Sequence, residues 1–292
     1  MATAIHLSVS TVSRSKGRSS VAAAAYRLGV SLVDDRTGLT HDYTRKGGVV
    51  AAATVLPKGA PAAYADPATL WNAAEAADKR VNSVTAREWQ IAVPFGLSEA
   101  DALKAGRAYA SWLADRYGVA VSVAVHRDND RDASGKPKPE AKRGFHLHLL
   151  GTTRQVGPDG FGPKTRVLDD KKTGPAEVEA CRAFWAAIAN ELAQGRDYDH
   201  RSHKRQGLPS PPPAFGAGAT ARARRGQSSG RVRAAAAARS RRGRLEWAKD
   251  ALSGLLDAWE VLRPLGAALD ARRAARAQGG PPAPSPGRRP RF

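Results

Sequence analysis

The spacing of hydrophobic positions in the first 200 residues switches repeatedly between a period of two and a period of three to four. Ile5, Leu7 and Val9 alternate with polar residues, which predicts a strand over 3–12 because successive strand side chains point to opposite faces. Further strands are predicted at 86–93, 119–126 and 144–151. Alanine-rich composition predicts a helix over 21–27, and the capping residues Asp66 and Ser98 begin predicted helices over 66–81 and 98–117. Apolar residues spaced three and four apart predict a further helix over 175–194.

Two of the predicted strands carry histidines. His146 and His148 are two residues apart and therefore share one face of their strand. The charged connector 127–143 allows the strand 119–126 to pair with them as an antiparallel hairpin, which brings His126 opposite the pair. Three neutral imidazoles can hold a divalent cation and leave positions open for a substrate. The alternative is that these histidines are structural residues of the strands.

A small, polar and basic loop, residues 13–20, leads into the alanine-rich helix 21–27. Ser19 or Ser20 can cap this helix. A helix N-terminus with a basic serine-glycine loop favours phosphate binding, because its free N–H groups point at the ligand. Tyr26 lies near the end of the helix, where its hydroxyl is expected to reach the same phosphate region.

The charge of the chain points to a polyanionic partner. Lys and Arg number 47 against 27 Asp and Glu, a formal charge of +20, which favours nucleic acid before a membrane surface. Cys181 is the single cysteine, which excludes an intramolecular disulfide and suits a reducing cytoplasm. No apolar run approaches the ~20 residues of a membrane span, so no membrane insertion is expected. The N-terminus lacks the pattern of a secretory signal.

Several segments together resemble the MobA/MobL family of plasmid mobilisation relaxases, which belong to the HUH endonucleases. The segments are IHLSV at 5–9, SRSKGRS at 13–19, AAAAYR at 22–27, HDYTRKGGVV at 41–50, REWQIAVP at 87–94, HLH at 146–148 followed by TTR at 152–154, and DHRS at 199–202. They occur in the order of the family, and the resemblance covers residues 1 to about 208.

The resemblance implies an α+β fold with a central antiparallel sheet and flanking helices. It also implies a histidine-bound divalent metal, Mn²⁺ or Mg²⁺, and a tyrosine that cuts one DNA strand at an origin of transfer through a 5′-phosphotyrosyl intermediate, with later rejoining. By position, Tyr26 matches the nucleophile, and His126, His146 and His148 match the metal triad. Accessory relaxosome proteins and a coupling protein are the implied partners, in the bacterial cytoplasm.

The sequence also allows other interpretations of these residues and of the function. Glu88 is expected to orient one ligand histidine through its second ring nitrogen, or else to be a solvated strand charge. Tyr43 is the rival of Tyr26 as nucleophile. A basic DNA-binding protein without catalysis, and an HUH replication initiator or transposase, are the alternative functions. The residues expected to contact DNA are Arg14, Lys16, Arg18, Arg27, Arg45, Lys46, Arg201, Lys204 and Arg205.

Four prolines between 209 and 213 predict a domain boundary, with a relaxase domain at 1–208 and a basic tail at 209–292. Residues 214–292 hold 17 Lys and Arg against 5 Asp and Glu, and nine arginines between Arg222 and Arg244 have no acidic residue among them. Such a stretch is expected to be largely disordered when free. One amphipathic helix is predicted at 245–262.

Overall fold

The computed structural model describes residues 3–128, 137–138, 144–193 and 197–208, with five single positions between 225 and 240. The chain divides into two compact units, Met1–Pro211 and Pro212–Phe292, and the fold described below is that of the first unit. The predicted helix at 245–262 lies outside the described residues.

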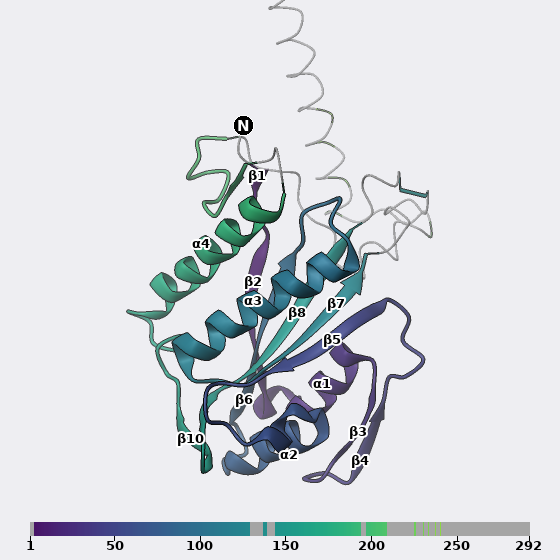
Figure 1. Ribbon diagram of the computed structural model, residues 1–292, viewed down its shortest axis with the longest axis vertical. Helices are drawn as coiled ribbons and strands as arrows, with labels where there is room; N and C mark the ends of the chain where they lie inside the picture. The colour runs from purple at the N-terminus through teal and green to yellow at the C-terminus, as the bar shows by residue number, and fades with distance from the viewer. Residues whose placement is uncertain are drawn as a thin grey trace, which may run out of the picture. The chain divides into compact units, whose positions relative to one another are not determined.

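A five-stranded antiparallel sheet is the centre of the first unit (Figure 1). Its strands run in the spatial order β2 (Leu7–Ser13), β6 (Val84–Ala92), β8 (Phe145–Thr152), β7 (Val121–Arg127) and β5 (Val49–Val55). The predicted hairpin is confirmed: β7 and β8 are antiparallel neighbours, with His126 directly opposite His146. The predicted α+β fold with a central antiparallel sheet is therefore also confirmed.

One face of the sheet is apolar and covered by two long helices, α3 (Glu99–Tyr117) and α4 (Gly174–Leu192). Trp89 and Leu149 from the sheet are fully buried in this layer together with Trp185 from α4. Gly106 lets α3 approach closely, because a Cβ there would lie 2.9 Å from a methyl group of Val123 on β7. No helix in the described residues is long and apolar enough to cross a membrane.

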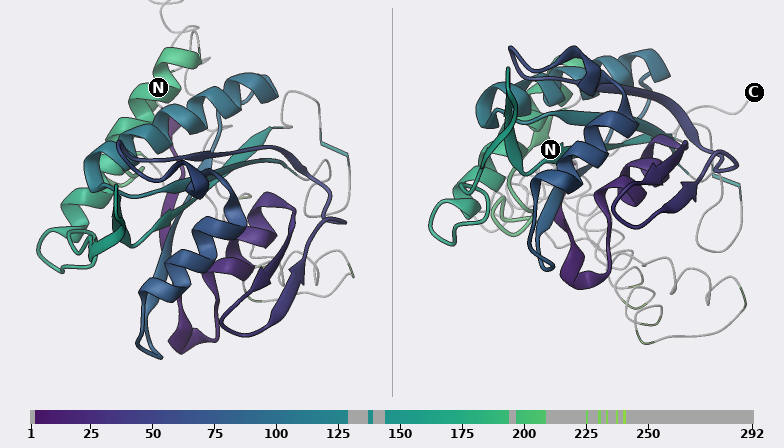
Figure 2. Two further views of the ribbon diagram at one scale, coloured as in Figure 1. Left: turned by 60° about the horizontal axis from the view of Figure 1, so that its bottom comes forward. Right: turned by 90° about the horizontal axis from the view of Figure 1, so that it is seen from below.

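The opposite face is covered only in part, by α1 (Ser20–Leu28) and α2 (Pro67–Ala77) (Figure 2). Both helices pack on a second apolar cluster. The predicted helix 66–81 ends four residues early. Its next residue, Asp78, is buried and forms ion pairs with Arg154 and Lys164, which hold it in an extended conformation. Because α1 and α2 leave part of this face open, polar side chains of β6, β7 and β8 can line a site there.

Shorter elements complete the unit. The hairpin β3 (Ser31–Asp34) and β4 (Leu39–Asp42) follows α1, and the hairpin β9 (Arg154–Gly157) and β10 (Gly160–Lys164) follows β8. The strand predicted from residue 3 is divided: β1 (Thr3–Ala4) leaves the sheet and pairs in parallel with β11 (Tyr198–Asp199). Two 3-10 turns, η1 (Arg14–Lys16) and η2 (Ala62–Ala65), precede α1 and α2.

Candidate metal centre and nucleophile

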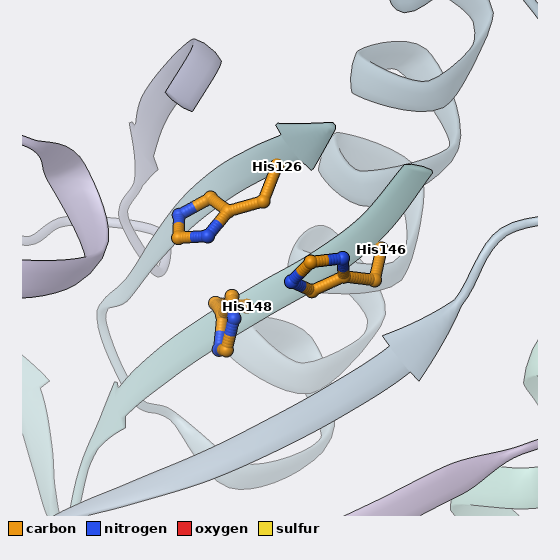
Figure 3. A group of neighbouring side chains, drawn as sticks. All are labelled: His126, His146 and His148. Carbon is orange, nitrogen blue, oxygen red and sulfur yellow. The ribbon is translucent and has the colours of Figure 1, made fainter. Parts of the chain in front are cut away.

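Three histidines meet on the partly open face of the sheet (Figure 3). His126 lies on β7, and His146 and His148 lie on β8. One ring nitrogen of each histidine lies within 4.8 Å of the corresponding nitrogens of the other two. The three rings belong to adjacent strands in a fixed register, so the sheet itself sets their spacing.

Each imidazole donates a hydrogen bond through one nitrogen to an oxygen that can only accept. The Nδ1 atom of His148 lies 2.6 Å from Glu88 Oε1, and that of His146 lies 2.7 Å from Asp128 Oδ1. The Nε2 atom of His126 lies 2.6 Å from the main-chain carbonyl oxygen of Arg27. These acceptors assign the proton to the bonded nitrogen, so the second nitrogen of each ring keeps its lone pair for a metal ion.

Burial favours the neutral form of two of the rings, and hydrogen bonds favour the charged form of the two carboxylates. Burial lowers the pKa of His126 to about 4 and also lowers the pKa of His148. Burial acts to raise the pKa of Glu88, but hydrogen bonds from His148 and Arg27 outweigh it and bring the pKa to about 2. The hydrogen bond from His146 lowers the pKa of Asp128. Neutral imidazoles oriented by anionic acceptors are the donor set that a divalent cation needs.

Tyr26 lies on the last turn of α1 with 45% of its surface exposed. Its ring contacts Tyr43 edge-on at 5.2 Å between centroids, and the ammonium of Lys46 lies 3.5 Å from its centroid. Lys46 Nζ also donates to the carbonyl oxygen of Tyr26 at 2.8 Å. Tyr43 is instead partly buried against the second apolar cluster, so Tyr26 is the more accessible of the two proposed nucleophiles.

The end of α1 explains why this helix reaches the histidines. Gly29 takes the left-handed conformation, and its N–H bonds to the carbonyl of Ala25. The carbonyls of Tyr26 and Arg27 are then left without partners inside the helix. Lys46 and His126 supply those partners, so the C-terminal turn of the tyrosine helix is bonded directly to one ring of the histidine cluster.

The phosphate site expected at the start of α1 is wrong, because a carboxylate of the chain already occupies that position. Glu75 Oε1 accepts from the N–H and the hydroxyl of Ser20, each at 2.7 Å, and Ser19 caps the next two N–H groups. Arg14 binds the other oxygen of Glu75 at 2.6 Å with its side chain 9% exposed. Tyr26 lies on the last turn of the same helix, where it contacts Tyr43 and Lys46.

The remaining residues predicted to contact DNA fall into three groups, and their contacts with DNA stay predictions. Lys16, Arg18, Arg45 and Lys204 are exposed. Arg201 and Arg205 are exposed but form ion pairs with Asp199 and Glu179. Arg27 and Lys46 lie in the site itself, where they bond to the groups described above.

Three contacts of the site are absent from the sequence predictions: Asp128 with His146, Lys46 with Tyr26, and the carbonyl of Arg27 with His126. A signal existed for Asp128: the alternation that places His126 on this face continues to residue 128, two positions later. The other two contacts join residues far apart in sequence, His126 to Arg27 and Lys46 to Tyr26, and no local pattern indicates them.

The antiparallel sheet and the histidine cluster define an α+β protein with a candidate three-histidine metal centre beside an exposed tyrosine. The chain belongs to the MobA/MobL family, whose family model matches residues 18–225. It is 39% identical over 229 residues to the mobilization protein MobL of Acidithiobacillus ferridurans, an alignment that covers 71% of this chain and 60% of MobL. It is 31% identical to the probable mobilization protein MobA of Bifidobacterium longum, covering 69% of this chain and 41% of MobA.

Both relatives are longer, and this chain spans less than two thirds of either one. A solved structure described as "Molecular Basis of Vancomycin Resistance Transfer in Staphylococcus aureus" has the same fold, with a TM-score of 0.58 and 23% sequence identity. The match covers 68% of this chain and all of that one. It therefore supports the architecture of the first unit.

Proposed function

We propose that the protein is a mobilisation relaxase, which nicks one DNA strand at a plasmid origin of transfer, remains attached through a 5′-phosphotyrosine and later rejoins the strand. One observation carries this proposal: the helix of the exposed Tyr26 is hydrogen-bonded to a three-histidine cluster on the open sheet face. Membership of a family that includes mobilization proteins supports it.

The histidine cluster fits a divalent cation because one nitrogen of each ring lies within 4.8 Å of the other two and each ring is anchored by a hydrogen bond. Burial also favours the neutral form of His126 and His148. His126, His146 and His148 would hold the ion, and Mn²⁺ suits three nitrogen ligands better than Mg²⁺, which prefers oxygen. The bound ion would supply a Lewis acid for a non-bridging phosphate oxygen.

Tyr26 is the proposed nucleophile of the strand-cleavage step. The hydroxyl oxygen of Tyr26 forms a bond to phosphorus as the bond from phosphorus to the 3′ oxygen breaks. The tyrosine proton leaves, and the released 3′ oxygen takes up a proton. One phosphodiester replaces another, so the step is reversible and needs no ATP, which suits an enzyme that must reseal the strand.

The test is to incubate the protein and Mn²⁺ with single-stranded DNA from the transfer origin of its own plasmid. A relaxase gives a protein–DNA adduct that survives denaturation and a free 3′-hydroxyl end. A basic DNA-binding protein without catalysis shifts the DNA but forms no adduct. A replication initiator or transposase of the same chemistry would attach to a replication origin or a transposon end instead, so cleavage of those sequences is compared in parallel.

The proposed setting follows from this activity. The DNA partner is single-stranded DNA at the origin of transfer, in the bacterial cytoplasm. Accessory relaxosome proteins and a coupling protein are the further partners that we propose.

Lys46→Met should slow adduct formation on the order of 10-fold, because a misplaced reacting group loses rate even when it is still present. The substitution removes the hydrogen bond to the Tyr26 carbonyl and the cation over its ring. Single-turnover kinetics at saturating DNA measures the effect, and Lys104→Met, at an exposed position of α3, is the control. Equal rates for the two variants would show that Lys46 does not help to place Tyr26.

Truncation after Pro213 should weaken DNA binding and reduce its dependence on salt. The tail carries a net charge of +12 over residues 214–292, and cations that neutralise phosphates bind by releasing counterions without reading bases. A salt titration of binding, with a map of the nick, compares the full chain with residues 1–213. A moved nick, or an unchanged salt slope, would contradict this role of the tail.

A further inference from the structure

Arg27 is attached to the histidine cluster in two independent ways. Its guanidinium binds both oxygens of Glu88, at 2.7 Å from Nε and 2.5 Å from Nη2. Glu88 in turn accepts from His148 at 2.6 Å. The main-chain carbonyl of Arg27 accepts from His126 at 2.6 Å. One residue therefore supports two of the three rings.

The environment of these contacts favours a fixed geometry. The side chains of Arg27 and Glu88 are only 14% and 11% exposed. A third N–H of the guanidinium donates to the carbonyl of Ala23 one helical turn earlier, at 2.8 Å, so the side chain is braced against its own helix. A bidentate arginine–carboxylate pair fixes the relative orientation of the two side chains and also pairs their charges.

We propose that Arg27 is a positioning residue, which orients His126 and His148 for the metal ion and ties both to the helix that carries Tyr26. This inference rests on the metal centre of the proposed function. It replaces the DNA-phosphate contact expected for Arg27 from its sequence. Arg27 directly follows Tyr26, so its bonds to Glu88 and His126 also hold the helical turn that carries the proposed nucleophile.

The test measures Mn²⁺ binding by calorimetry without DNA, so that it does not depend on activity. Residues that orient metal ligands change metal affinity on the order of 10- to 100-fold when they are replaced. We expect that loss for Arg27→Gln and for Glu88→Gln, and a smaller loss for Arg27→Lys, which keeps the charge without the two-pronged geometry. Arg107→Gln, at an exposed position of α3, should bind like the unmodified chain.

A double variant shows whether Arg27 acts through Glu88. If it does, the double variant Arg27→Gln/Glu88→Gln should lose Mn²⁺ affinity by a factor much smaller than the product of the factors measured for the two single variants. Fully multiplicative losses would overturn the proposed link to Glu88. If Arg27→Gln does not fold, as judged by circular dichroism, Arg27→Lys replaces it in the same cycle.

Two further measurements distinguish a wrong role for Arg27 from a wrong metal centre. DNA binding in excess EDTA should be equal for Arg27→Gln and Arg107→Gln; a loss confined to Arg27→Gln, with Mn²⁺ affinity unchanged, would assign Arg27 to a phosphate contact and overturn the inference. No Mn²⁺ uptake by the unmodified chain would overturn the metal centre itself. Uptake by the unmodified chain and equally by every Arg27 variant would overturn only the role of Arg27.

Discussion

Tyr26→Phe is expected to abolish covalent attachment to DNA, with a loss of at least about 10⁴-fold in the rate of adduct formation, because it removes the nucleophile itself. The phenyl ring keeps the edge-on contact with Tyr43 and the ammonium of Lys46 over its face. Folding, metal binding and non-covalent DNA binding should therefore persist. A denaturing gel with labelled origin DNA measures the adduct, and a gel shift in EDTA measures binding.

Tyr43→Phe is the matched control. It removes one hydroxyl from the neighbouring ring, which is partly buried against the second apolar cluster, and adduct formation should fall by no more than a few-fold. The opposite result, with Tyr26→Phe still attached to DNA and Tyr43→Phe inactive, would make Tyr43 the nucleophile.

Local patterns in the sequence predict the strands of the site and the pairing of two of them. The alternation at 119–126 and 144–151, with one connector between them, was enough to predict the hairpin that sets His126 opposite His146. The order of the whole sheet could not be obtained in this way. β5 and β2 form the two edges, and each is paired with a strand more than 60 residues further along the chain.

The charge pattern of the sequence does not show which individual basic residues face solvent and which bind a carboxylate of the chain. Arg14 and Arg27 both stand in segments that suggested phosphate contacts, yet each binds a carboxylate 61 residues away, Glu75 and Glu88 respectively. A guanidinium near a buried carboxylate gains a two-pronged ion pair, and sequence spacing does not reveal which arginines find one. The exposed Lys16 and Arg18 have the same local composition and a different environment.

Replacing His126, His146 or His148 with Ala should in each case remove most Mn²⁺ binding and most cleavage, because two imidazoles cannot replace a three-ligand site. The three variants should differ in stability. His126→Ala leaves the Arg27 carbonyl without its donor, a partly buried group whose loss of a partner costs about 1–3 kcal/mol. His148→Ala should cost less, because Glu88 keeps its ion pair with Arg27.

Metal content, cleavage in excess EDTA and cleavage after added Mn²⁺ measure these effects, and thermal unfolding without metal measures the difference in stability. His200→Ala serves as the control, because His200 lies beside Glu179 and outside the cluster. EDTA should stop cleavage by the unmodified chain and Mn²⁺ should restore it, while the three cluster variants stay inactive. If all three kept their metal and cleaved at the full rate, the histidines would be structural and the metal centre would have to lie elsewhere in the chain.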